Sequence, residues 1–176
     1  GAKTLLANPL GAVWETMRAA DAVSAPYAWL GLIAFALQIY FDFYGYSLMA
    51  IGMGRMFGFH FPQNFDHPYS AASVQLFWRR WHITLGAWFR EYVYIPLGGS
   101  RGGALKTLRN LFIVWTLTGL WHGASWNFVL WGLWYFVLLA AERFVTGGFL
   151  RRHEGIGHVY TLLAVLLGWA LFATDT

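Results

Sequence analysis

The stretch "LRNLFIVWTLTGLWHGASWNFVLWGLWYFVLLAAERF", residues 108–144, decides the fold of this chain. It contains two apolar arms, 107–121 and 126–144, separated by the four residues His-Gly-Ala-Ser. Two apolar segments around a short polar link are typical of an antiparallel helical hairpin in a membrane. The first arm is shorter than the roughly 20 residues that a full crossing requires. We therefore expect two transmembrane or re-entrant helices here.

The composition extends this interpretation to the whole chain. Of the 176 residues, 58% are hydrophobic and 11% are charged, and the mean hydropathy is +0.47. A soluble domain carries about a quarter charged residues, so the protein class is integral membrane protein. The chain has no cysteine, which excludes disulfides, thiolate nucleophiles and cysteine-based metal sites from its chemistry.

The charge distribution indicates a lipid partner and argues against nucleic acid. The net charge is +4, but the twelve basic residues lie mainly between apolar segments, where they orient helices or meet anionic headgroups. Ten of them fit one side of the membrane, which would be cytoplasmic, whereas Lys3 and Arg18 do not. The first residue is not Met and an apolar run lies close to the last residue, so we expect a central-to-C-terminal fragment of a longer protein.

Three further segments complete the predicted topology. Apolar runs predict a transmembrane helix over 27–58 and another over 158–173. Between them, 73–94 places aromatic side chains on one helical face and arginines on the other, which is typical of an amphipathic interfacial or re-entrant helix. The predicted fold class is all-α: a polytopic membrane protein fragment, treated as one partial domain over 1–176, with about four transmembrane or re-entrant helices plus the amphipathic helix.

Two histidines are the strongest candidates for chemistry. His122 lies in the hairpin link between Gly119 and Gly123, and an ionisable residue in an apolar region is a candidate functional site. With an unperturbed pKa of about 6.5, imidazole can accept a proton from a hydroxyl at neutral pH. The alternative is an ordinary turn histidine at the headgroup level. His82 borders the aromatic face of 73–94, and interfacial anchoring is its alternative role.

Other polar residues have weaker claims. Asp42 lies near the middle of the first long apolar run, where a carboxylate is costly unless it is paired, hydrated or protonated. It either orients a histidine or arginine in a polar cavity or belongs to a structural polar cluster. His60, Asp66 and His67 match no zinc spacing, so we expect no metal site.

Three segments resemble the membrane-bound O-acyltransferase family, in its bacterial alginate O-acetyltransferase branch. They are "FDFYGYSLMAIGMGRMFGFHFPQNFDHPYS" (41–70), "FWRRWHITLGAWFREYVYIPLGGSRGG" (77–103) and "LRNLFIVWTLTGLWHGASWNFVLWGLWY" (108–135). The motifs are long and unusual in composition. Leu48 and Glu91 each stand where many relatives have Asp. Family members are considerably longer than this chain.

The resemblance implies a polytopic enzyme that moves an acyl group, typically acetyl, from a cytoplasmic donor to a hydroxyl at the other membrane face. The family histidine of the W-H-G motif matches His122, and that of the R-W-H motif matches His82. His122 is the expected general base. His82 is expected to position a substrate or to polarise the acyl carbonyl. The expected substrate-binding residues are Trp81, Trp121 and Trp126 as walls, Arg79 and Arg80 for donor phosphates, and Asp42 as polar support.

The same resemblance implies the partners and the location. No bound cofactor is expected, and the acyl donor is a co-substrate such as acetyl-CoA or an acylated carrier. The acceptor is an exported, alginate-like polysaccharide, with periplasmic acetylation or export proteins as partners and the bacterial inner membrane as location. Two alternatives stay open: a non-enzymatic membrane subunit for polysaccharide translocation, and a relative that transfers D-alanyl groups or O-acylates peptidoglycan. We expect the fragment alone to be inactive.

Overall fold

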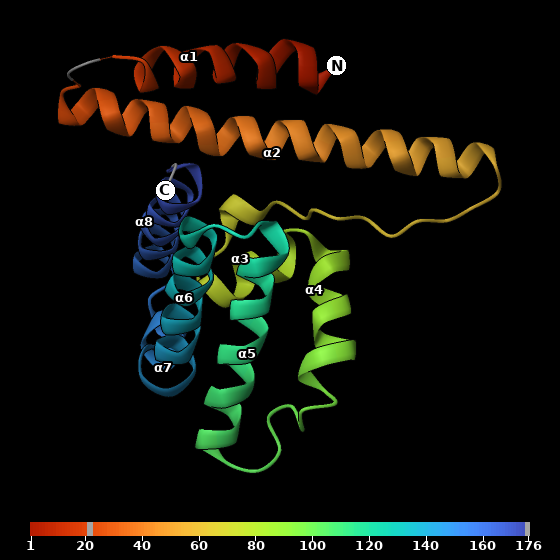
Figure 1. Cartoon of the computed structure of the whole chain (residues 1–176), viewed down its shortest axis with the longest axis vertical. Helices are drawn as coiled ribbons and strands as arrows, with labels where there is room; N and C mark the ends of the chain where they lie inside the picture. Colours follow the sequence, from red (N-terminus) through yellow and green to blue (C-terminus); the bar gives the residue numbers. More distant parts are fainter. Residues whose placement is uncertain (21–22, 175–176) are drawn as a thin grey trace. The chain divides into compact units, whose positions relative to one another are not determined.

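The computed structural model describes residues 1–20 and 23–174 (Figure 1). The chain divides into two units, with the boundary between residues 64 and 65. Apart from one isolated β-bridge, the regular structure in the described residues is helical. Three helical stretches are long and apolar enough to cross a membrane: Ala25–Met56, Trp126–Arg152 and Glu154–Ala173. The predicted fold class, an all-α polytopic membrane protein, is confirmed.

The first unit is a pair of antiparallel helices (Figure 1). The N-terminal segment forms η1 (Lys3–Ala7) and α1 (Asn8–Arg18), and these pack along the long helix α2 (Ala25–Met56). Trp14 contacts Phe35 with 5.0 Å between ring centroids. Gly31 allows the close approach, because a Cβ there would lie 2.2 Å from the sulfur of Met17. After α2 the chain turns back, and Asn64 donates a hydrogen bond to the Ser47 hydroxyl at 3.3 Å.

The second unit holds the remaining helices, with α5, α6 and α8 as its longest members. Its elements are η2 (Pro68–Ser70), α3 (Val74–Arg80), α4 (Ile83–Phe89), η3 (Arg90–Tyr94), α5 (Ala104–His122), α6 (Trp126–Ala141), η4 (Glu142–Thr146), α7 (Gly147–Arg152) and α8 (Glu154–Ala173). The turn region before α5 is fixed by Asn110, which is fully buried. Its amide donates to the carbonyls of Leu97 and Gly99 at 3.1 and 2.9 Å.

Helices α5 and α6 form the hairpin that the opening stretch predicts, with their backbones in direct contact (Figure 1). A Cβ at Gly119 would lie 2.4 Å from the carbonyl oxygen of Phe128, and one at Gly132 would lie 2.4 Å from that of Trp115. Small residues at helix crossings let membrane helices pack through van der Waals contact of their backbones. The two glycines therefore fix how closely the arms approach.

The segment 73–94 is divided in the structure, which differs from the single helix expected there. Helix α3 ends at Arg80, Trp81 is extended, and α4 begins at Ile83. The physical reason lies outside the segment: Trp81 pairs with Phe65 in the isolated antiparallel bridge and is 4% exposed. Burial of this ring, together with the bridge, outweighs the local helical periodicity.

The break also divides the aromatic face that the periodicity predicts. Phe77 and Trp81, before the break, are buried in the second unit, where their rings stack at 5.6 Å. Trp88 and Tyr92, after the break, are 51% and 65% exposed. Only the second half of the segment therefore presents an aromatic surface of the kind that favours a membrane interface.

Candidate active site

His82 occupies the break between α3 and α4 in a left-handed backbone conformation, with φ 46° and ψ 54°. This conformation is uncommon for a residue other than glycine and persists only where the surroundings impose it. On the N-terminal side, Trp81 bridges to Phe65, and the Asp66 amide donates to the Arg80 carbonyl at 3.0 Å. The backbone before His82 is therefore held by contacts with the preceding loop.

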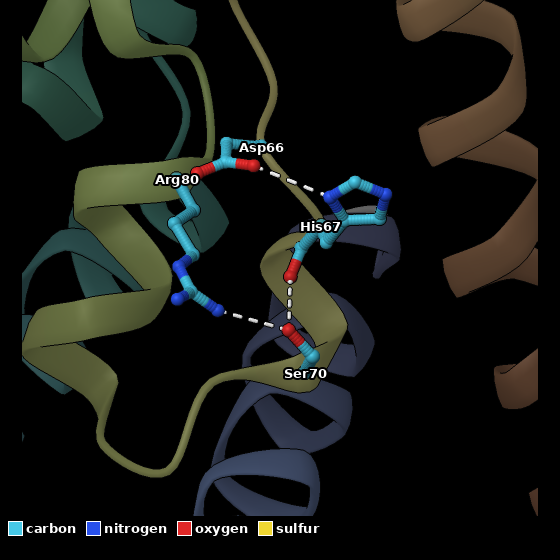
Figure 2. A network of polar contacts seen from close by, with 4 residues as sticks. All are labelled: Asp66, His67, Ser70 and Arg80. Carbon is cyan, nitrogen blue, oxygen red and sulfur yellow. Dashed lines mark hydrogen bonds and ion pairs between the residues drawn. The ribbon is translucent and has the colours of Figure 1, made fainter.

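A polar network in that loop supports the same arrangement (Figure 2). The Arg80 guanidinium donates to the Ser70 hydroxyl at 2.9 Å, and this hydroxyl donates to the His67 carbonyl at 2.8 Å. The imidazole of His67 hydrogen-bonds to the Asp66 carboxylate at 3.2 Å. Because Ser70 contacts the backbone of His67 and not its ring, the network lacks the geometry of a nucleophile beside its base. It holds the loop to the end of α3.

His122 is the last residue of α5 and is surrounded by aromatic rings from several helices. Its ring centroid lies 4.9 Å from that of Trp121, 5.0 Å from Trp131 of α6 and 5.1 Å from Phe172 of α8. Gly123, the next residue, leaves room for Phe128, since a Cβ at this glycine would lie 2.8 Å from the Phe128 ring. The hairpin link therefore places an imidazole in a largely apolar, half-buried environment.

Trp121 connects the two histidines. Its ring centroid lies 6.1 Å from that of His82 and 4.9 Å from that of His122, and its side chain is 56% exposed. Two histidines forty residues apart in the sequence, each at a helix end, thus meet beside one partly exposed ring. The structure brings together the two residues that the sequence motifs single out.

Both imidazoles are predominantly neutral at pH 7. They lie outside the three stretches that can cross the membrane. Burial lowers the pKa of His82 to about 4. Burial also lowers the pKa of His122 to about 4, and repulsion from a charged His82 contributes in the same direction. A neutral imidazole carries one N–H donor and one acceptor nitrogen, so such a pair can accept a proton at one ring and donate a hydrogen bond from the other.

The other predicted site residues fall into different surroundings. Trp81 is buried against Trp169, at 5.0 Å between centroids, so it supports the His82 turn from inside the unit. Trp126, at the start of α6, is 73% exposed. Arg79 is exposed, whereas Arg80 is engaged by Ser70. Among the predicted walls, Trp121 contacts both histidines.

Asp42 belongs to the first unit, where the Lys3 ammonium forms an ion pair with its carboxylate. The two residues line an open cavity of about 470 Å³ together with Ile39, Phe43, Tyr46 and Met49. The charge of Asp42 is thus compensated by a lysine of the N-terminal segment. Its role in substrate binding stays a prediction.

Sequence reasoning missed three rings that surround His122: Phe128, Trp131 and Phe172. A helical signal exists for the first two, because Phe128 and Trp131 are three residues apart and share a face of α6 near the link. No local pattern connects Phe172, fifty residues further on, to the histidine. Glu142, an acidic residue in an apolar run, also carries a signal, since such residues are rare without a partner.

Comparison with known proteins agrees with these motifs. The chain is 44% identical over 174 residues to the probable alginate O-acetylase AlgI of Pseudomonas aeruginosa, covering 98% of this chain and 34% of that protein. It is 41% identical over 157 residues to the peptidoglycan O-acetyltransferase of Helicobacter pylori, covering 87% of this chain and 30% of that protein. It is 30% identical over 122 residues to the teichoic acid D-alanyltransferase of Bacillus subtilis, covering 65% of this chain and 31% of that protein.

The chain spans about a third of the length of these curated relatives. The model of the membrane-bound O-acyltransferase family matches residues 14–165, which include both histidines and Trp131, whereas Phe172 lies beyond the matched range. On this match, the chain belongs to the membrane-bound O-acyltransferase family.

Proposed function

We propose that this protein is a membrane O-acyltransferase that acetylates hydroxyl groups of an exported polysaccharide. The observation that carries the proposal is the meeting of His82 and His122 beside Trp121, within the R-W-H and W-H-G motifs. An alginate-like acceptor is favoured, because the similarity to AlgI covers 98% of the chain, against 87% for the peptidoglycan enzyme.

The proposed reaction uses a thioester donor, such as acetyl-CoA or an acylated carrier. His122 accepts the proton of the acceptor hydroxyl, whose oxygen attacks the acyl carbon. An N–H of His82 donates a hydrogen bond to the oxyanion that forms. The carbon–sulfur bond then breaks, the ester remains on the acceptor, and the thiolate leaves with the proton from His122. General base catalysis of this kind contributes about 10²–10⁴-fold to the rate.

The neutral state of the two rings supports this division of roles. A histidine protonated before the reaction has no acceptor nitrogen and cannot act as a base. Arg79, which is exposed one turn before the break, is the proposed contact for donor phosphates. We place the protein in the bacterial inner membrane, with periplasmic acetylation or export proteins as partners.

The test replaces His122 by Ala in the full-length protein, in its host. Acetyl esters on the exported polymer are then measured beside the amount of polymer and of protein. Loss of ester with normal export and a normal protein level supports the proposal. Normal ester content refutes it, and simultaneous loss of polymer export favours a translocation subunit instead.

A further inference from the structure

A buried carboxylate in the second unit holds the N-terminus of α3. Glu142 is the first residue of η4, directly after α6, and is 7% exposed. One of its carboxylate oxygens accepts a hydrogen bond from the Val74 amide at 2.6 Å, and the other accepts one from the Gln75 amide at 2.9 Å. The Tyr160 hydroxyl of α8 also hydrogen-bonds to this carboxylate. Three helical segments thus meet at one side chain.

These bonds do more than cap a helix. Helix α3 already has a local cap, because the Ser73 hydroxyl accepts from the Leu76 amide at 3.0 Å. Glu142 lies 68 positions from Val74 in the sequence. Its carboxylate accepts hydrogen bonds from the two backbone amides that Ser73 leaves without a partner. Hydrogen bonds to an ionised carboxylate at a helix N-terminus are among the stronger ones in proteins. The carboxylate therefore fixes where α3 lies, whereas the serine supports its helical conformation.

The position of α3 determines the position of His82. The helix has seven residues, so on its own it is too short to be stable, and contacts with other elements determine its placement. Arg80 ends the helix six residues after Val74, or about 9 Å along the axis at 1.5 Å per residue, and His82 lies two residues further on. A tilt of about 5° at the Glu142 end would move the far end by about 1 Å. A displacement of that size at a catalytic group can cost about 10²-fold in rate.

Glu142 is also tied to the other histidine. It continues the helical stretch of α6, and Trp131 of α6 contacts His122 at 5.0 Å. On the α3 side, Trp78 contacts the same Trp131 ring at 5.5 Å. We propose that Glu142 is a positioning residue that sets the placement of His82 relative to His122. This inference rests on the proposed function.

The test uses the purified full-length protein with a thioester donor and an acceptor oligosaccharide. Glu142→Gln keeps the size of the side chain but removes the charge and replaces one acceptor oxygen by an NH₂ group that faces a backbone amide. The matched control is Glu154→Gln, an exposed acid in the first turn of α8. We expect kcat of Glu142→Gln to fall about 10- to 100-fold with the donor KM within about twofold of wild type, and wild-type values for the control.

Two results overturn the inference. One is wild-type kcat in Glu142→Gln. The other is a kcat loss that disappears when rates are divided by the folded fraction from thermal unfolding, which would show a structural role alone. If Glu142→Gln does not fold, Tyr160→Phe removes one hydrogen bond and leaves the carboxylate. It is expected to lower kcat about 2- to 10-fold at unchanged KM, and wild-type kcat there overturns the inference as well.

Failure of the proposed function gives a different pattern. In that case the wild-type protein forms no ester from any thioester donor, and no comparison of variants is needed. If the wild-type protein is active and both variants, Glu142→Gln and Tyr160→Phe, are equally active, the acyltransferase proposal stands. That result refutes only the positioning role of Glu142.

Discussion

The acid side of the pH–rate profile tests the environment of the histidine pair. An exposed histidine base, with a pKa of about 6.5, would be only about 3% neutral at pH 5. Burial, together with repulsion from a charged His82, lowers the pKa of His122 to about 4, and burial lowers that of His82 to about 4. A base with that pKa stays about nine-tenths neutral at pH 5. We therefore expect kcat/KM to stay nearly constant from pH 7 to pH 5 and to decline only close to pH 4.

The pKa values of the two histidines are lowered because burial disfavours the charged form of the ring. Burial penalises imidazolium, so the folded protein holds the proton less tightly than free imidazole does, and the acceptor nitrogen persists to lower pH.

The assay measures initial rates with the purified full-length protein and a neutral oligosaccharide acceptor, which has no group that titrates in this range. Thermal unfolding at each pH confirms that the protein remains folded, and donor hydrolysis without enzyme is subtracted. A fall of about 25-fold between pH 7 and pH 5, with half-maximal kcat/KM near pH 6.5, would refute the reasoning. Such a profile would mean that the catalytic histidine is solvated as in an unfolded chain.

Three substitutions test the packing and the site. Gly119→Ala should lower the free energy of unfolding by about 1–3 kcal/mol in thermal melts, because the added Cβ would meet a backbone carbonyl. The control Gly148→Ala has open space around its Cβ and should melt at the wild-type temperature. Trp121→Ala should lower kcat/KM about tenfold, because it removes the ring between the histidines. The control Trp126→Ala should keep kcat/KM within about twofold of wild type, since this ring is mostly exposed. Equal effects of the two substitutions would contradict the assignment of Trp121. Asn110→Ala should cost about 1–3 kcal/mol in chemical denaturation, since it leaves the Gly99 carbonyl without its donor and the Leu97 carbonyl with Arg109 alone. An unchanged midpoint would contradict that role.

The hairpin and its histidine were predictable because their signals are local. Apolar runs of the right length flank a polar link, and Gly119 beside His122 marks a close helix approach. The W-H-G and R-W-H motifs also located both histidines. Only the family resemblance gave the two histidines roles in one reaction, because nothing in either local sequence refers to the other.

The break at Trp81 could not be read from the periodicity of its own segment. Its causes are a bridge to Phe65, sixteen residues earlier, and burial against Trp169 of the last helix. The pairing of Asp42 with Lys3 is equally non-local, since 39 residues separate them. Sequence periodicity reports which face of a helix is apolar, but it carries no information on which distant segment covers that face.

The left-handed backbone at His82 restricts which amino acids can take its place. A Cβ in this conformation costs roughly 1–2 kcal/mol for most residues, whereas Gly and, to a lesser degree, Asn and Asp adopt it readily. An alanine scan would therefore confound two effects at this position, the missing imidazole and a strained turn. Asparagine separates them, because it tolerates the turn and offers an amide that does not titrate. Among natural variants of this position, the same conformational filter predicts His, Asn, Asp and Gly, and few β-branched residues.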